Sequence, residues 1–216
     1  DALFNYLVLL GWSPGDDREV LTRDELIGLF TLDRVKSSPA QMDIKKLEWM
    51  NGEYIRAMPE NTFREACRKQ MVDHGLWRDD MDETYFRQVV SLMQARLKRI
   101  SEFVEVSTYF FSEEYDFDEK AVRKRLNKPD AIDGLRLLRE GYATLEPFTE
   151  ESAEEALRAL AEESGGNTGS FVHPARVAVS GLAGGPGLFE MLALLGRERV
   201  VQRLDRAIER YRDTSS

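Results

Sequence analysis

Few groups in this sequence could carry out chemistry, and the first is a glycine-rich stretch. Residues 181–187 read GLAGGPG, a composition that can cradle a phosphate with backbone N–H groups. A phosphate loop of the nucleotide-hydrolase type also needs a following Gly-Lys-Ser/Thr, which this stretch lacks. We therefore expect residues 181–187 to form a turn ahead of a helix.

The remaining candidates are two histidines, one cysteine and adjacent carboxylates. His173 precedes a proline in a predicted loop, and His74 lies at a predicted helix end, where carbonyl dipoles favour an imidazole. Cys67 falls on an apolar stripe, which predicts a buried, unreactive thiol, while Glu113 and Glu114 are typical of solvated surface. These residues form neither a nucleophile motif nor a zinc site. No catalytic residue and no metal site are predicted, and the pattern favours a binding module.

The composition indicates a soluble globular chain. Of its 216 residues, 42% are apolar and 32% are charged, and the mean hydropathy is −0.44. No apolar run approaches the roughly 18 residues of a membrane span, so we expect one to three domains and no membrane anchor. The chain opens on Asp1 with neither an initiator methionine nor a signal peptide, which predicts a fragment, and the single cysteine fits a reducing cytoplasm.

The charge is negative but unevenly placed. A net charge of −9 argues against wrapping nucleic acid by bulk electrostatics, since domains that do so are usually basic. Acidic residues gather in 79–83 and 150–163, whereas basic residues gather in 120–128 and 197–212. A chain with this pattern can still present a basic face.

The apolar spacing is helical along almost the whole sequence, which predicts an all-α fold. Thr22 with Glu25 forms a predicted capping box, and Asp43 is a predicted N-cap. Helices are expected over residues 2–10, 22–30, 44–55, 63–75, 120–126, 130–141, 147–160, 186–196 and 200–211. Pro59 and Pro147 mark expected domain edges.

Three further expectations concern the path of the chain. The apolar residues from Phe86 to Val104 predict one continuous, central helix after the acidic start at 79–83. Residues 165–170 are predicted to be a loop. The last helix is expected to pack Val200, Leu204, Ala207, Ile208 and Tyr211 and to place its arginines on other faces.

Three stretches share their order and spacing with one known family. They are FNYLVLLGWSPG at 4–15, SPA at 38–40 followed by DIKKLEWMNGEYIR at 43–56, and RVAVSG at 176–181 followed by GPGLFE at 185–190 and LLGRER at 194–199. In these stretches the chain resembles bacterial-type glutamyl-tRNA synthetases (glutamate-tRNA ligases). The first is similar to the segment after the second catalytic signature loop, the second to the stem-contact segment, and the third to the last anticodon-binding helices.

The resemblance implies a class I enzyme of protein biosynthesis whose N-terminal Rossmann-type domain binds ATP, Mg and glutamate. Neither ATP-binding signature of that class is present here, so this chain is expected to carry no active site and no cofactor of its own. The resemblance implies a small stem-contact domain over residues 1–57 and two α-helix-cage anticodon-binding domains over 58–145 and 146–216. It also implies a cytoplasmic monomer that binds tRNA(Glu) and neither DNA nor membrane.

The resemblance further assigns site residues. Arg96, in the Leu-Met-Gln-Ala-Arg stretch, takes the place of an arginine that reads the third anticodon base. The pairing edge of cytosine offers O2 and N3 acceptors to a guanidinium, whereas guanine turns N–H donors toward it. Members that also charge tRNA(Gln) tend to have a glutamine there. Gln94 lies two positions away, so an alignment that placed it at the site would reverse the predicted discrimination.

The first anticodon base is expected at residues 184–188, which begin within the glycine-rich stretch 181–187. There, Gly184, Gly185, Pro186, Gly187 and Leu188 correspond to the family's contact, with Arg176 close by. Glycines let a base approach the main chain, and N–H groups at a helix start read acceptors. The family often has a polar residue where this chain has Gly185, so a backbone contact is expected instead. Expected contacts with the tRNA backbone come from Lys36, Lys45 and Arg56, with weaker candidates at Lys120, Arg123, Lys124 and Arg125.

Several functions stay open beside recognition of tRNA(Glu) by a discriminating enzyme. The parent protein could be non-discriminating and also charge tRNA(Gln). The chain could instead be a stand-alone helical scaffold that binds proteins through apolar helix faces, or a free-standing regulatory relative that binds tRNA without charging it.

Overall fold

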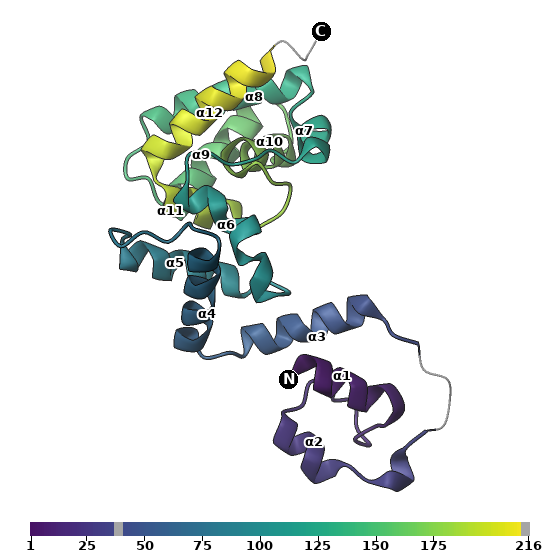
Figure 1. The fold of residues 1–216 in the computed structure, drawn as a ribbon. Coiled ribbons are helices and arrows are strands. Elements are labelled where there is room, and N and C mark those ends of the chain that lie inside the picture. The colour runs from purple at the N-terminus through teal and green to yellow at the C-terminus, as the bar shows by residue number, and fades with distance from the viewer. Residues whose placement is uncertain (37–40, 213–216) are drawn as a thin grey trace. The chain divides into compact units, whose positions relative to one another are not determined.

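The structure, a computed structural model, describes residues 1–36 and 41–212, and within these ranges it consists of helices without strands. The predicted all-α class is therefore confirmed. Figure 1 shows the course of the chain. The Ser38–Ala40 part of the stem-contact motif lies outside the described residues.

The chain divides into two compact units. Unit 1 comprises Asp1–Met81 with Met93–Val104, and unit 2 comprises Asp82–Leu92 with Glu105–Ser216. The three domains expected over residues 1–57, 58–145 and 146–216 remain a prediction.

Two helices of unit 1 begin at the capping residues that the sequence predicts. It contains α1 (Ala2–Gly11), α2 (Arg23–Leu29), η1 (Leu32–Arg34), α3 (Ile44–Arg56), α4 (Glu60–Asp73) and η2 (Ile100–Glu102). The capping box of Thr22 and Glu25 is present, and Asp43 caps α3 by accepting from Lys45 N and Lys46 N. Both predicted caps are confirmed.

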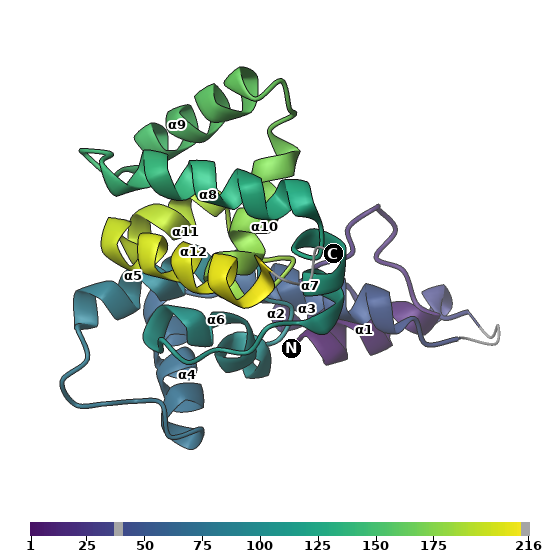
Figure 2. The same ribbon diagram turned by 90° about the horizontal axis from the view of Figure 1, so that it is seen from above.

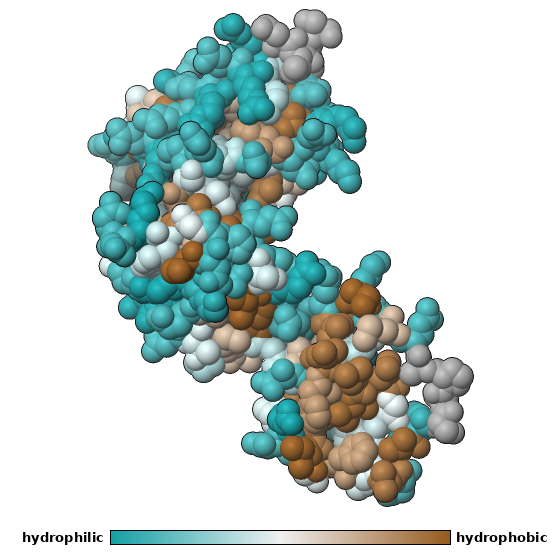
Figure 3. All heavy atoms as spheres, in the orientation of Figure 1, coloured by the Kyte–Doolittle hydropathy of each residue, from teal (hydrophilic) through white to brown (hydrophobic). Residues whose placement is uncertain are grey.

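Two small apolar clusters hold the start of unit 1 together. In one, α1 packs on α3 through Ala2, Tyr6 and Met50; the other consists of Trp12, Leu21 and Leu26. The buried Asn5 carboxamide links them, because its Oδ1 accepts from Leu21 N at 2.8 Å and from Tyr54 Oη at 3.0 Å. Large apolar side chains nevertheless remain exposed over this part of the surface (Figure 3): Leu3, Leu7, Ile27, Leu32, Ile44 and Trp49. Exposed apolar patches of this kind mark interaction surfaces.

Unit 2 is a helical bundle around a continuous apolar core. Its elements are most of α5 (Glu83–Gln94) and of α6 (Phe103–Phe111), together with α7 (Glu119–Arg125), α8 (Pro129–Ala143), α9 (Glu150–Glu163), α10 (Gly169–Ser180), α11 (Leu188–Leu195) and α12 (Arg197–Tyr211). Helices α8, α10 and α12 pack on one another, while α9 contacts α8 and α11 (Figure 2). Val200, Leu204, Ala207 and Tyr211 are buried on one face of α12, as their spacing predicts.

The prediction of a single long helix from Phe86 to Val104 is wrong. Helix α5 ends at Gln94, and α6 begins only at Phe103. Contacts from α3 hold the intervening turn, since Asn51 Nδ2 donates to Lys98 O at 2.5 Å and Glu48 pairs with Arg99 at 3.6 Å. Apolar periodicity does not register such tertiary contacts.

Two other expectations need correction. His173 does not lie in a loop, because α10 begins at Gly169 and includes Pro174. Pro174 lacks an N–H group, but it and Phe171 are buried, and this packing offsets the missing helix bond. Pro186 is not the first residue of a helix; α11 begins at Leu188, with Gly187 as its N-cap.

Candidate functional site

The candidate site is built around the C-terminal end of α10, which carries Arg176 and leads into the glycine-rich loop. Ser180 Oγ donates to Arg176 O at 2.8 Å, and Leu182 N donates to Ser180 Oγ at 3.2 Å. Ser180 is buried, so these bonds fix the start of the loop on the helix that holds Arg176.

Gly181 makes the turn out of α10. It adopts φ +75°, ψ −8°, and its N–H donates to Val177 O at 2.8 Å. Asp118 N donates to Gly181 O at 2.9 Å, and a Cβ at position 181 would lie 2.0 Å from Asp116 O. A backbone atom leaves no room there, so the turn requires glycine for both conformation and space.

The structure brings Arg176 together with the loop, as the sequence predicted. Gly185 is exposed and has φ +150°, and a Cβ on it would lie 3.3 Å from Arg176 Nη1 and 3.8 Å from Tyr109 Oη. The guanidinium therefore lies directly beside the loop backbone. A polar residue such as the family often has at this position would be strained in this conformation, which explains the glycine.

At the start of α11, two side chains are buried and one backbone N–H group binds a side chain of the same helix. Pro186 and Leu188 are buried, so their side chains anchor the loop. Gly187 N donates to Glu190 Oε2 at 3.0 Å, and the first bond within α11 runs from Met191 N to Gly187 O at 3.1 Å. The N–H group of Gly187 is thus engaged, whereas those of residues 188 and 189 precede the first helical bond and have no carbonyl partner in their own helix.

Arg203 of α12 is the central polar contact behind this site. Its side chain is 0% exposed. Nη1 donates to Val179 O at 2.9 Å, and Nη2 donates to Tyr109 O at 2.8 Å and Ser112 O at 3.2 Å. Nε and Nη2 also bind the Glu113 carboxylate at 3.2 and 3.0 Å. One guanidinium therefore joins α12, the end of α6 and the end of α10.

The charges around Glu113 favour its ionised form. Burial raises the pKa of this carboxyl group, but the hydrogen bond and charge of Arg203, together with Arg199 and Arg206, outweigh burial and lower the pKa overall. Tyr115 stacks under Arg203, with the guanidinium carbon 4.7 Å from the ring centre, and burial raises its pKa to about 12. The neutral phenol donates to Ala178 O at 2.9 Å, which fixes another carbonyl of α10.

The sequence interpretation missed Arg203 by expecting the arginines of the last helix on exposed faces. A signal was present, because Arg203 lies three residues after Val200 and four before Ala207, both on the buried stripe. An arginine at such a position is buried only when enough acceptors meet it, which the helix pattern alone does not reveal.

Arg96 lies in unit 1, in the turn that follows α5, whereas Arg176 and the loop belong to unit 2. Its side chain is exposed and has no ion pair among the residues that the structure describes. Gln94, by contrast, donates from Nε2 to Ile55 O at 2.9 Å and Met58 O at 2.8 Å. The amide of Gln94 is therefore occupied within the protein, while the guanidinium of Arg96 faces solvent.

The three residues expected at the tRNA backbone differ in their surroundings. Lys36 and Lys45 are exposed, and within residues 1–36 and 41–212 neither forms an ion pair. Arg56 forms an ion pair with Glu53 one turn earlier on α3. Its charge is thus partly compensated before any ligand binds.

The side chains of Cys67 and His74 contribute to packing and to a helix end rather than to the candidate site. Cys67 is fully buried, and burial raises its pKa to about 12, so the thiol stays protonated as expected. His74 follows the last residue of α4, and its Nδ1 lies 2.8 Å from Gln70 O, which confirms its predicted position at a helix end.

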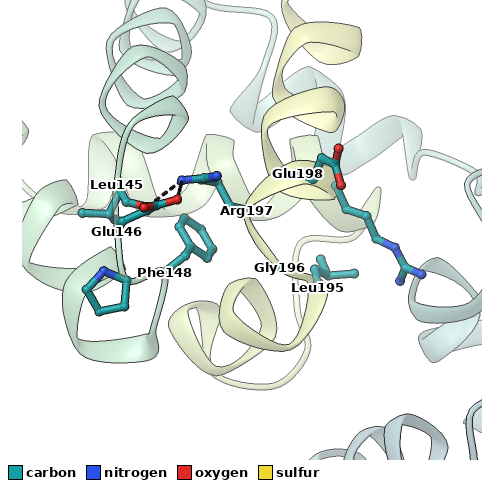
Figure 4. A pocket seen from close by; sticks show the side chains of 9 residues that line it. Leu145, Glu146, Phe148, Leu195, Gly196, Arg197 and Glu198 are labelled. Atoms are coloured by element: carbon teal, nitrogen blue, oxygen red, sulfur yellow. Dashed lines mark hydrogen bonds and ion pairs between the residues drawn. The ribbon is translucent and has the colours of Figure 1, made fainter.

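A separate surface cavity of about 810 Å³ lies where α11 meets α12 (Figure 4). Leu145, Phe148 and Gly196 line it, and Arg197 crosses it to form an ion pair with Glu146 at 2.7 Å and a bond to Leu145 O at 3.4 Å. It contains none of the predicted site residues. Across the described chain, no helix is long and apolar enough to cross a membrane.

Comparison with protein families finds two matches in this chain. Residues 62–208 match the family model described as an anticodon binding domain. Residues 1–49 match the model of the class I (E and Q) tRNA synthetase catalytic domain. The candidate residues of α10, its following loop and the turn after α5 all lie within the first match.

Relatives of known sequence and structure share this similarity. The chain is 40% identical over 216 residues to a glutamate–tRNA ligase of Moorella thermoacetica, covering 99% of this chain and 44% of the relative. It is 41% identical over 213 residues to that of Thermus thermophilus, covering 96% of this chain and 44% of the relative. A crystal structure of a glutamate tRNA ligase from Elizabethkingia meningosepticum superposes with a TM-score of 0.76 at 27% identity, covering 97% of this chain and 41% of that one.

The chain thus spans less than half the length of these relatives. The family match extends over most of the chain and includes Arg96, Arg176 and the loop after α10. The chain belongs to the anticodon binding domain family and corresponds to the C-terminal region of glutamate–tRNA ligases.

Proposed function

We propose that this chain recognises the anticodon and stem of tRNA(Glu) as part of an enzyme that attaches glutamate to that tRNA. The main support for this proposal is the arrangement at the end of α10, where Arg176 lies beside the exposed backbone of Gly185. A fixed cation next to accessible backbone suits an unstacked base, which offers both acceptors and an adjacent phosphate. The match to an anticodon binding domain supports this assignment.

The third anticodon base is proposed to contact Arg96. Its exposed guanidinium needs no internal partner to be displaced, whereas the amide of Gln94 already binds two backbone carbonyls. This difference supports Arg96 as the reader and therefore a preference for cytosine over guanine. The proposed enzyme discriminates tRNA(Glu) from tRNA(Gln).

The first anticodon base is proposed to meet the loop of residues 184–188. Because Pro186 and Leu188 are buried, the contact comes from backbone groups of Gly184 and Gly185 and from the N–H groups that open α11. Arg176 supplies the charge beside them. Gly187 contributes through its small size, since its own N–H binds Glu190.

Unit 1 is proposed to contact the stem and to adjoin the catalytic domain. Lys36 and Lys45 are suited to phosphate contacts, and Arg56 can take part once its pair with Glu53 opens. The exposed apolar side chains of α1–α3 and the catalytic-domain match over residues 1–49 support contact with the rest of that domain. ATP, Mg and glutamate are proposed to bind there, in a cytoplasmic monomer that binds no DNA.

Binding of labelled tRNA tests the proposal. We expect tRNA(Glu) to bind more tightly than a variant with guanine as its third anticodon base, by about 1–3 kcal/mol, or roughly 5- to 150-fold. Arg96→Gln should remove most of this preference without unfolding the chain. Arg158→Gln removes an exposed arginine that pairs with Glu154 and should leave the preference unchanged.

Three other results would contradict parts of this proposal. If Arg96→Gln keeps the full preference, the assignment of the third base is wrong. Equal affinity of the unmodified chain for both RNAs would indicate the non-discriminating enzyme, and charging of both tRNAs by the full-length protein would establish it. Absence of salt-sensitive, anticodon-dependent binding would favour the protein scaffold.

A further inference from the structure

Helices α7 and α8 both contact α10 in unit 2 (Figures 1 and 2). Residues at the ends of these three helices line a small basic pocket. Its volume is about 200 Å³, and its lining includes Lys124 and Arg125 at the end of α7, Lys128 and Asp130 at the start of α8, and His173 of α10. We call it the basic pocket. It is distinct from the loop of residues 184–188.

Within residues 1–36 and 41–212, the positive charge of the basic pocket is only partly compensated. Lys124, Arg125 and Lys128 form no ion pair within 4.0 Å in the described part of the chain. Asp130 is the single carboxylate on the lining, against three cations. On a chain with 39 acidic and 30 basic residues, the basic pocket is therefore a local concentration of positive charge that attracts an anionic ligand.

Two helix starts add to this positive potential. Lys128 precedes α8 and Thr168 precedes α10, and neither side chain caps its helix. Asn167 Oδ1 accepts from Ser170 N at 3.1 Å, and Asp130 lies in the first turn of α8, so each start is partly satisfied. Both helices are long enough, at 15 and 12 residues, for their N-terminal dipoles to favour an anion. Gly169 and Ser170 of the first turn of α10 line the pocket directly.

His173 responds to the same potential. Burial lowers its pKa below the usual 6.5, and the charges of Arg125, Arg176 and Lys124 lower it further. The imidazole is therefore neutral near pH 7 and offers a hydrogen bond without adding repulsion to the cations.

We propose that the basic pocket binds one phosphate group of the tRNA backbone. This inference rests on the proposed function and adds to it a contact that fixes the position of the RNA without reading a base. Lysines act as point charges toward phosphate, and an adjacent arginine can bind two of its oxygens. The contact should therefore contribute affinity that depends on salt and is independent of the anticodon sequence.

The test is the salt dependence of tRNA(Glu) binding by the whole chain. The variant Lys124→Ala/Lys128→Ala removes two exposed side chains, so the fold should be kept, which circular dichroism checks. Loss of one phosphate contact should reduce the slope of log K against log salt by about 0.7–0.9 and weaken binding about five- to eightfold at 0.1 M salt. The ratio of affinities for cytosine and guanine at the third anticodon base should stay unchanged.

A matched control removes the same charge elsewhere. Lys69→Ala/Arg158→Ala takes away two exposed cations that lie outside the basic pocket, and it should leave the slope as in the unmodified chain. If the pocket variant also keeps the original slope while the unmodified chain binds with anticodon preference, the phosphate contact is refuted and the proposed function stands. If the unmodified chain shows no anticodon-dependent binding, both proposals fail.

A further arm distinguishes RNA from free phosphate. Inorganic phosphate is titrated into the chain while the imidazole resonances of His173 are followed by NMR. For a site that needs the rest of the RNA for affinity, we expect shifts only at millimolar concentrations. Saturation at micromolar phosphate, combined with an unchanged RNA slope in the pocket variant, would show a free-phosphate site and overturn the proposal.

Discussion

Replacing Arg203 by methionine removes the guanidinium and keeps an unbranched side chain of similar length in the core of unit 2. In the native protein this guanidinium binds the carbonyls of Val179 and Tyr109 at 2.9 and 2.8 Å. Both bonds are buried, and methionine cannot replace them. Glu113 also loses its partner, but its side chain is 46% exposed and can be hydrated instead.

The loss of stability in Arg203→Met comes mainly from the two carbonyl groups that are left without a donor. An unsatisfied buried acceptor costs about 1–3 kcal/mol, so the pair costs roughly 2–6 kcal/mol, in line with the roughly 3–5 kcal/mol for breaking a buried ion pair. We therefore expect Arg203→Met to lower the free energy of unfolding by about 3 kcal/mol. For a chain of this length that corresponds to a fall in Tm of roughly 6–12 °C.

Urea denaturation followed by far-UV circular dichroism measures the loss. Trp12, Trp49 and Trp77 all lie in unit 1, so tryptophan emission serves as a separate probe of that unit. The control is Arg206→Met, which removes a 44% exposed arginine that lies 3.8 Å from the same carboxylate and donates to Glu113 O at 2.6 Å. Because these contacts are exposed, the loss should cost less than about 1 kcal/mol. If Arg203→Met is no more destabilising than this control, the carbonyl contacts do not stabilise unit 2 as argued.

Two further perturbations follow from the same region. Gly181→Ala should lower the free energy of unfolding by roughly 2–5 kcal/mol, because it combines left-handed strain with a Cβ placed 2.0 Å from Asp116 O. The control Gly165→Ala has φ +66° but open space around its Cβ, so its loss, measured by thermal unfolding, should be about 1 kcal/mol. Equal losses for the two variants would contradict the steric argument. The pKa of Glu113 is lowered in the folded chain, so its contribution to stability is present above the unfolded value of 4.5 and is lost as pH falls through the folded pKa. Glu113→Gln should therefore make the free energy of unfolding less dependent on pH below 4.5. An unchanged pH dependence in that range would refute this linkage.

The sequence by itself determined the helical class and most helix positions. Apolar residues at intervals of three and four can be buried together only on a helix, and caps such as Thr22 and Asp43 fix where helices begin by local hydrogen bonds. The family resemblance also implied that Arg176 lies near the glycine-rich loop. The roles of Arg96 and the loop in reading bases remain predictions.

Tertiary structure decided the features that depend on partners distant in the chain. The turn after Gln94 is held by α3, and Arg203 is buried because carbonyls from α6 and α10 meet its guanidinium. The basic pocket likewise forms only when α7 and α10 come together. Local spacing specifies which face of a helix is apolar, but the cost of burying or unpairing a charge depends on groups that only the folded chain brings into contact.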